Sequence, residues 1–266
     1  MRKTNSPVKQ ALILAAGLGS RLLDQTRALP KALLEVNERP ILDYQLEALY
    51  DNGIRKIYIV VGYQGEKIRQ HVHQFWANRM NVSIIENEMY RSSSSSLSFW
   101  LASDYLGDAP YLHINCDLIF SSELVARLVA TRQHNVIVFD RQARLADNME
   151  LVTLGGNRIQ KMQRRFKKRV DGKAFGLAKF SPKTVNWLQG RIQKYFDGAD
   201  SDQHLFGLVA EAIAVRDFYV LDAENDLILE VNTKSDLDAA NRVLADMQLF
   251  TDFHFNSKYF RAAIGI

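Results

Sequence analysis

The strongest constraint on the fold of this chain is a buried strand that stops at a glycine turn. Residues Val8–Ala15 form a short apolar run, the pattern of a strand buried on both faces of a sheet. The turn Gly17-Leu18-Gly19-Ser20 follows, with Arg21 directly behind it and Pro30-Lys31 about ten residues later. Glycines at such a place let backbone N–H groups face oxygen-rich anions, above all phosphates. The stretch therefore predicts a polyphosphate cradle at the end of the first strand.

Two better-known phosphate motifs do not match this turn. Ser20-Arg21 follows Gly19 where a Walker loop needs Gly-Lys-Ser/Thr, and Leu22 stands where the dinucleotide fingerprint needs its third glycine. The missing glycine also excludes a dehydrogenase. A bare Gly-x-Gly is equally compatible with a simple tight turn, and it is the added Arg21, Thr26 and Lys31 that favour phosphate binding.

The next hundred residues alternate between strand and helix patterns. Helices are expected over 40–52 and 64–76, and strands over 55–61 and 82–85. This rhythm predicts parallel βαβ units with helices on both faces of the sheet. Ligands of such sheets bind outside the carboxyl ends of the strands, where the glycine turn lies.

A second candidate position is Asp117, at the end of the predicted strand in Pro110–Phe120. An acid there faces the same rim as the glycine turn, although it could also be a loop or helix-capping aspartate. Cys116 beside it is expected to pack, since no base is placed to activate the thiol.

The serine run Ser92–Ser96 has the composition of a linker, but an apolar helix pattern follows it immediately. That helix is expected to bury Leu97, Trp100, Leu101 and Tyr105. Two roles remain open for Ser94 and Ser95, which are capping the helix and contacting a base or ribose.

From Asn148 the pattern changes to antiparallel strands. A hairpin is predicted around Gly155-Gly156 and a second strand pair around Asp171-Gly172. These strands are expected to form a small extension that covers the phosphate site. The basic run Lys161–Arg169 is either a solvated edge or a contact to an anionic group of a ligand.

Towards the end, helices are predicted over 181–196 and 204–215 and a strand over 218–221. The phrase Leu227–Asn241 then predicts a strand and a helix capped by Thr233 and Asp236. His113 and His204 are isolated histidines without metal-ligand spacing, and both are expected to be structural or exposed.

Length and composition indicate one domain. The 266 residues, 47% of them hydrophobic, suit a single α/β domain: a core over 8–147, a ligand-binding extension over 148–215, a return to the core over 216–248 and a tail over 249–266. The aromatic tail could cover a surface or join two subunits of a homodimer. A single cysteine, a net charge of +4 and no apolar run near about 18 residues lead us to expect a cytoplasmic protein with no membrane span and no nucleic-acid partner.

From Leu14 to Pro40 the chain resembles a known family. The pattern LAAGxGxRLxxxTxxxPKxLxxV is similar to the signature of the MobA-like nucleotidyltransferases, which activate sugar phosphates and related phospho-metabolites. The closest likeness is to the cytidylyltransferases of phosphorylated small molecules. One departure is Asp24, where many members have proline. The resemblance implies a Rossmann-like, mostly parallel sheet with a small antiparallel extension.

The resemblance also implies roles for individual residues. Arg21 would hold the leaving pyrophosphate, Lys31 would neutralise the α-phosphate, and Asp117 and Asn232 would hold Mg²⁺, with Glu230 as a substitute ligand. Many relatives have aspartate in place of Asn232, and an amide oxygen serves a hard cation with less charge. The nucleotide would contact Leu14, Ala15, Ala16, Gly17 and Gly19, and also Ser94 and Ser95, which replace an asparagine pair common in relatives.

The acceptor is expected near Lys161 and Lys173. Relatives often have glutamate at the position of Lys173, and this exchange disfavours a cationic acceptor such as phosphocholine. The resulting expectation is a Mg²⁺-dependent transfer from an NTP, with CTP favoured, to a phosphorylated small molecule, for surface-polysaccharide or lipid-headgroup modification. Alternatives are a sugar-1-phosphate uridylyl- or guanylyltransferase and a catalytically silent nucleotide-binding subunit.

Overall fold

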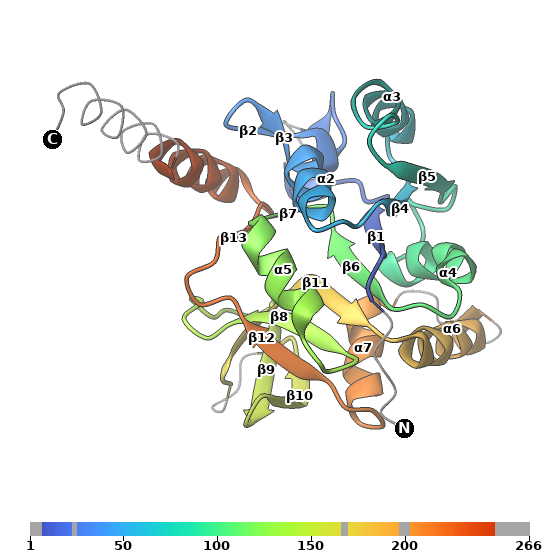
Figure 1. Ribbon diagram of the computed structural model, residues 1–266, viewed down its shortest axis with the longest axis vertical. Coiled ribbons are helices and arrows are strands. Elements are labelled where there is room, and N and C mark those ends of the chain that lie inside the picture. Colours follow the sequence, from blue (N-terminus) through green and yellow to red (C-terminus); the bar gives the residue numbers. More distant parts are fainter. Residues whose placement is uncertain (1–6, 23–25, 166–169, 197–202, 248–266) are drawn as a thin grey trace, which may run out of the picture.

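The structure, a computed structural model, describes residues 7–22, 26–165, 170–196 and 203–247. Its main feature is a nine-stranded mixed sheet in the order β5-β4-β1-β6-β11-β8-β12-β10-β9 (Figure 1). Its strands are β1 Gln10–Ala15, β4 Lys56–Val61, β5 Asn81–Glu86, β6 Tyr111–Asn115, β8 Val136–Asp140, β9 Glu150–Gly155, β10 Arg158–Gln163, β11 Gly172–Phe180 and β12 Tyr219–Asp222. Two small sheets pair β7 Leu118–Phe120 with β13 Ile228–Glu230, and β2 Glu35–Val36 with β3 Arg39–Pro40.

Helices connect these strands. They are α2 Ile41–Asp51, α3 Gly65–Phe75, α4 Ser95–Leu106, α5 Ser122–Ala130, α6 Pro182–Phe196, α7 Leu205–Ile213 and a last helix over 234–247. Strands β5, β4, β1 and β6 run parallel, so their carboxyl ends meet at one rim of the sheet. The predicted βαβ rhythm is confirmed.

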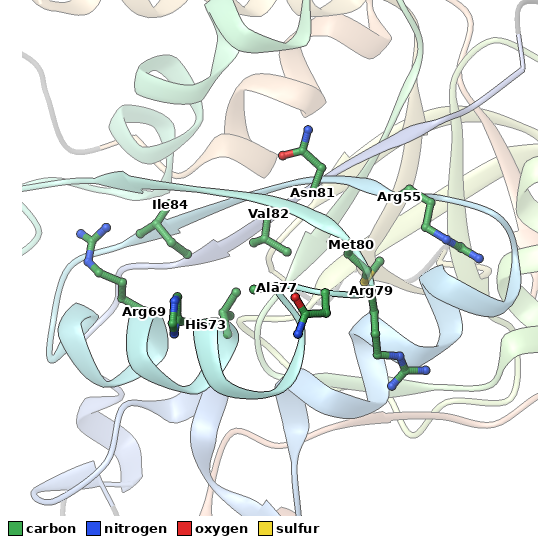
Figure 2. Close-up of a pocket in the computed structure, with 11 residues that line it drawn as sticks. Arg55, Arg69, His73, Ala77, Arg79, Met80, Asn81, Val82 and Ile84 are labelled. Atoms are coloured by element: carbon green, nitrogen blue, oxygen red, sulfur yellow. The ribbon is translucent and has the colours of Figure 1, made fainter.

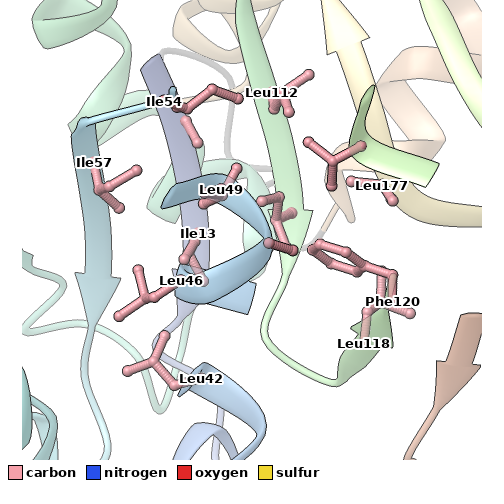
Figure 3. Packing of buried hydrophobic residues seen from close by; sticks show 14 of the residues in the cluster. Ile13, Leu42, Leu46, Leu49, Ile54, Ile57, Leu112, Leu118, Phe120 and Leu177 are labelled. Carbon is pink, nitrogen blue, oxygen red and sulfur yellow. The ribbon is translucent and has the colours of Figure 1, made fainter. Parts of the chain in front are cut away.

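The core lies on both faces of the sheet, because β1 is buried on both. Ala11, Ile13 and Ala15 pack on one side with α2, α3 and α5. Figure 3 shows Ile13 on this side, next to Leu46 and Leu49 of α2. Leu12 and Leu14 pack on the opposite side with α4, α6 and α7. Helices therefore cover both faces, as predicted.

The antiparallel extension is continuous with this sheet. The hairpin β9–β10 forms as predicted, but β11 also pairs with β9 through Gly172–Ala174 while its other end pairs with β6. The strands β11, β8, β12, β10 and β9 thus close on themselves like a barrel wall. The predicted second strand pair around Asp171-Gly172 is described only in its second half. That half is β11, a single nine-residue strand that begins at Gly172, whereas residues 166–169, where the first half was predicted, lie outside the described part of the chain.

One helix differs in detail from its predicted face. In α4, Leu97 is buried as predicted, but Tyr105 is 55% exposed, and the buried face continues through Phe99, Ala102 and Leu106. Val185, Leu188 and Ile192 of α6 are buried as predicted. The predicted role of the Phe196 side chain, the tail 249–266 and residues 166–169 of the basic run lie outside the described part of the chain.

His113, on β6, is fully buried among aromatic rings. Its ring centroid lies 5.9 Å from that of Phe180 and 5.6 Å from that of Phe206. Burial lowers the pKa of this imidazole from 6.5 to about 4, although the hydrogen bond with Asn115 opposes the shift. The neutral form is therefore the one that the fold accommodates.

This burial predicts a pH-dependent stability. Above pH 6.5 the imidazole is neutral in both states and contributes nothing. As the pH falls from 6.5 towards 4 only the unfolded chain takes up the proton, so the free energy of unfolding drops, by up to about 3 kcal/mol. Urea titrations across this range should show a shallower loss for His113→Gln. The exposed His134→Gln should behave like wild type, and parallel curves for wild type and His113→Gln would contradict this origin.

Candidate active site

The glycine turn lies at the carboxyl end of β1, as predicted. Gly19 adopts a φ of +65°, and a Cβ there would come within 2.9 Å of Thr26 Cγ2, so glycine is required on both counts. The buried Thr26 hydroxyl donates to the Leu22 carbonyl at 2.9 Å, and the Leu22 N–H donates to the Gly19 carbonyl at 2.8 Å. The threonine of the motif therefore holds the turn in shape.

Four residues predicted from distant parts of the chain meet beside this turn. Lys31 Nζ lies 2.8 Å from Asp117 Oδ2 and 3.0 Å from Asn232 Oδ1. Arg21 Nη2 donates to the same Asn232 oxygen at 2.6 Å. The side chains of Lys31 and Asp117 are only 11% and 16% exposed. Two cations, one carboxylate and one amide thus form a single hydrogen-bonded cluster, here called the charge cluster.

Local structure explains why these side chains converge. Asp117 lies between β6 and β7, and its carbonyl accepts the Val231 N–H at 2.9 Å where β13 pairs with β7. Asn232, which follows Val231 in the chain, donates its N–H to Asp236 Oδ2 at 3.0 Å. Thr233 and Asp236 exchange hydrogen bonds in the predicted capping box of the last helix. The box therefore fixes the start of that helix and, with it, Asn232.

A cleft of about 730 Å³ surrounds the charge cluster. Its floor includes Leu14, Ala16 and Gly17, whereas Ala15 points into the core and does not line it. Tyr90 and Ser93–Ser95, here called the serine turn, line the part where the nucleotide is predicted to bind, here called the nucleotide wall. Glu150, Arg164 and Lys173 line the part where the acceptor is predicted to bind, here called the acceptor wall. The cleft thus joins the predicted nucleotide half and the predicted acceptor half.

On the nucleotide wall, Ser94 and Ser95 have structural partners. Ser94 is the N-cap of α4, accepting from the Ser96 N–H, and its hydroxyl also donates to the Gln203 carbonyl. Ser95 Oγ accepts the Leu205 N–H at 2.9 Å. The capping role predicted for Ser94 is present, and both residues still line the cleft.

Asn87 was not predicted as a site residue. It is fully buried, and its side chain donates to Ser93 and Ser98 at 3.1 and 3.0 Å. It therefore connects the serine turn to α4. Its position directly after the third strand is the one signal that could have found it.

The acceptor wall carries two ion pairs. Lys173 Nζ lies 2.6 Å from Glu230 Oε2, and Arg164 Nε lies 3.3 Å from Glu150 Oε1. Burial raises the pKa of Glu150, an effect that Arg164 opposes and Glu230 reinforces. Lys173 therefore lies at the cleft, whereas the predicted Lys161 is exposed on β10 and does not line it. Arg164, from the same basic run, lines the cleft in its place.

Cys116 and His204, the remaining groups considered in the sequence, lie near the cleft. Burial raises the pKa of the Cys116 thiol to about 12, with Asp117 adding to the shift, so Cys116 is not a nucleophile near neutral pH. His204 is exposed at the start of α7 and lines the cleft. Across the described residues, no group of three or more His, Cys, Asp or Glu side chains is arranged to hold a metal ion.

A second depression lies between α3 and β5, where Arg55, Arg69 and Arg79 surround an apolar floor (Figure 2). The guanidinium carbons of Arg55 and Arg79 stand 3.7 and 4.5 Å from the Tyr50 ring centroid. Arg55 precedes β4 and Asn81 begins β5, so this depression reaches the amino-terminal rim of the sheet. The cleft around the charge cluster is at the carboxyl rim, where such sheets bind ligands.

Known proteins share the sequence pattern of this chain. The model of the MobA-like NTP transferase domain matches residues 11–176. The choline-phosphate cytidylyltransferase of Streptococcus pneumoniae is 28% identical over 244 residues, which are 88% of this chain and 98% of that protein. The CTP:phosphoglutamine cytidylyltransferase of Campylobacter jejuni is 29% identical over 136 residues, 49% of this chain and 52% of that protein.

Solved structures share the fold. The CTP:phosphocholine cytidylyltransferase from Streptococcus pneumoniae aligns with a TM-score of 0.71 at 24% identity, over 90% of this chain and all of that one. The inositol-1-phosphate CTP transferase from T. maritima aligns with a TM-score of 0.75 at 19% identity, over 88% and 93% of the two chains. The fold is thus that of the nucleotide-diphospho-sugar transferases, and the enzyme class is nucleotidyltransferase.

Within that class the chain belongs to the MobA-like NTP transferase family. The family model ends at residue 176, inside β11, so Glu230 and Asn232 come from the part of the chain beyond it. None of the helices in the described residues is both long and apolar enough to span a bilayer.

The cap on α4 yields a testable stability effect. Ser94→Ala removes an N-cap acceptor and a buried donor, and it should lower the free energy of unfolding by about 1 kcal/mol in urea titrations. Ser92→Ala, at an exposed position of the same run, should stay within about 0.5 kcal/mol of wild type. Equal stabilities of the two variants would refute the capping role.

Proposed function

We propose that this protein is a Mg²⁺-dependent cytidylyltransferase that joins CTP to a phosphorylated small molecule and releases pyrophosphate. The observation that carries the proposal is the charge cluster of Arg21, Lys31, Asp117 and Asn232 beside the glycine turn. CTP is favoured over other triphosphates because several of the similar proteins are named for CTP chemistry. A uridylyl- or guanylyltransferase is the alternative that the screen below tests.

The chemistry requires positioning and charge stabilisation. The acceptor phosphate is already ionised at neutral pH, so its oxygen attacks the α-phosphorus without a general base. A new P–O bond forms to the acceptor, the bond between the α-phosphorus and the β-phosphate oxygen breaks, and pyrophosphate carries away the electron pair. Lys31 neutralises charge at the α-phosphate and Arg21 holds the leaving pyrophosphate.

The cluster also suits a magnesium ion. Asp117 Oδ1 is buried and has no hydrogen-bond partner among the described residues, which leaves a carboxylate oxygen open to a cation. Mg²⁺ commonly takes one or two protein oxygens and completes its shell with water and substrate phosphates. Asp117 and Asn232 would hold it, and when bound it would add positive charge at the phosphates.

The acceptor wall favours a head group without net positive charge. Glu150 and Glu230 are each paired with a cation, Arg164 and Lys173, so the four charges balance. A quaternary ammonium would gain little electrostatic attraction there, because each carboxylate is already paired. An uncharged or zwitterionic group could hydrogen-bond to the carboxylates and to the cations. We place the product in surface-polysaccharide or lipid-headgroup modification and the enzyme in the cytoplasm.

The function is tested by a pyrophosphate-release screen. Each of the four NTPs is combined with phosphocholine, a zwitterionic phospho-amino acid or phospho-amide, a polyol phosphate and a sugar 1-phosphate. The proposal expects turnover with CTP and with an uncharged or zwitterionic acceptor. Release only with UTP or GTP would establish the alternative, and no release from any pair would favour a silent nucleotide-binding subunit.

Lys31→Ala should lower turnover by about 10²–10³-fold, the loss expected for one electrostatic stabiliser of the transition state. The measurement is pyrophosphate release at saturating substrates. Lys183→Ala, which removes an exposed lysine of α6 that does not line the cleft, is the matched control and should leave turnover unchanged. A Lys31→Ala enzyme as fast as wild type would eliminate the role given to this lysine.

Asp117→Ala should abolish the Mg²⁺-dependent rate while the protein still melts cooperatively. The readout is a Mg²⁺ titration of pyrophosphate release, alongside Asp238→Ala on the exposed face of the last helix. If Asp117→Ala responds to Mg²⁺ with the midpoint and amplitude of the parent, the metal ligand lies elsewhere.

A further inference from the structure

Asn115 lies in the cleft at the last position of β6 and has no role in the mechanism above. In the sheet it is paired with Leu14 of β1, on the nucleotide side, and its side chain lies over Gly176 of β11, on the acceptor side. All three residues line the cleft. Asn115 therefore stands where the two halves of the site meet, two residues before Asp117.

The orientation of its amide is set from the core by His113. Nε2 of the imidazole lies 3.2 Å from Asn115 Oδ1, and Nδ1 is buried without a hydrogen-bond partner in the described structure. A neutral imidazole carries one N–H. If that proton were on Nδ1 it would be an unsatisfied buried donor, so it belongs on Nε2, from which it donates to Asn115 Oδ1.

This arrangement leaves the amide nitrogen of Asn115 able to donate a hydrogen bond to a ligand. With Oδ1 occupied by His113, Nδ2 and its two hydrogens face the cleft, and no described residue accepts from them. A Cβ at position 176 would lie 2.1 Å from Nδ2, so glycine there gives the amide its space. The amide is thus held on one side by a buried ring and is open on the other.

The chemistry of the donor limits its acceptor. Arg21 and Lys31 already supply positive charge to the phosphates, whereas a carboxamide is an uncharged donor. An uncharged oxygen, such as a ribose hydroxyl or a hydroxyl or carbonyl of the acceptor, suits it best. Such a bond strengthens binding about three- to tenfold and distinguishes ligands that have the oxygen from those that lack it.

We propose that Asn115 is a substrate-binding residue that donates through Nδ2 to an uncharged substrate oxygen at the junction of nucleotide and acceptor, and that His113 is its positioning residue. The inference rests on the proposed function only for the identity of the substrates. The ring cluster around Phe180 and Phe206 holds His113, and His113 holds the amide.

The test separates substrate binding from folding. Asn115→Ala, His113→Leu, the double variant and His113→Gln are compared with Tyr111→Phe, a buried control on the same strand whose hydroxyl has no described partner. Steady-state kinetics give KM for NTP and acceptor separately, isothermal titration gives the Kd of each substrate, and thermal melting confirms the fold.

Asn115→Ala should raise KM and Kd of one substrate about three- to tenfold. A larger effect on the nucleotide identifies ribose, and a larger effect on the acceptor identifies its head group. His113→Leu should weaken the same substrate without adding to Asn115→Ala in the double variant, and His113→Gln, which retains an N–H, should restore most of the affinity. Tyr111→Phe should match wild type.

Unchanged KM and Kd for both substrates in a folded Asn115→Ala protein would overturn the binding role. Fully additive effects of His113→Leu and Asn115→Ala would overturn the positioning role. If wild type releases no pyrophosphate from any pair, the proposed function fails, and the titrations with CTP and with each acceptor still decide the role of Asn115. A wild-type protein that binds none of them overturns both.

Discussion

The site depends on one ion pair, between Lys31 and Asp117, which are 86 residues apart. Neither side chain is more than 16% exposed, so either charge alone would be costly to keep in place. Asn232 accepts from the same lysine and from Arg21, so one amide oxygen connects both cations to the carboxylate. The protein thus presents preorganised positive charge beside the glycine turn, together with one carboxylate oxygen that has no described partner.

The rest of the fold maintains that contact. Parallel pairing of β1 with β6 places the glycine turn and Asp117 at one rim, and pairing of β7 with β13 brings Asn232 to it from the far end of the chain. Strand β11 links β6 to the closed wall of β11, β8, β12, β10 and β9, so the predicted acceptor side of the cleft is part of the same sheet as the predicted nucleotide side. An arrangement of this kind suits catalysis by positioning two substrates.

Much of this could be predicted from local sequence. The turn, Arg21, Asp117 and the Thr233–Asp236 box each follow from a strand end or a capping pattern, and Lys31 follows from its spacing behind the turn. The strand-helix rhythm gives the parallel half of the sheet. Sequence patterns did not reveal three features that depend on how the strands pair. They are the pairing of β11 with β9, the position of Arg164 rather than Lys161 at the cleft, and the burial of His113 next to Asn115. A period-two pattern shows which side chains share a face but not which strand lies next to it.

The most direct test of the account is the fate of the α-phosphorus. CTP labelled with ³²P at the α or the γ position is incubated with Mg²⁺ and the acceptor found in the screen, and the products are separated. The account predicts that the α label appears in the activated product and the γ label in pyrophosphate, and that both transfers disappear in Asp117→Ala. Transfer of the γ label to the acceptor, or of the α label to water alone, would contradict nucleotidyl transfer at this site.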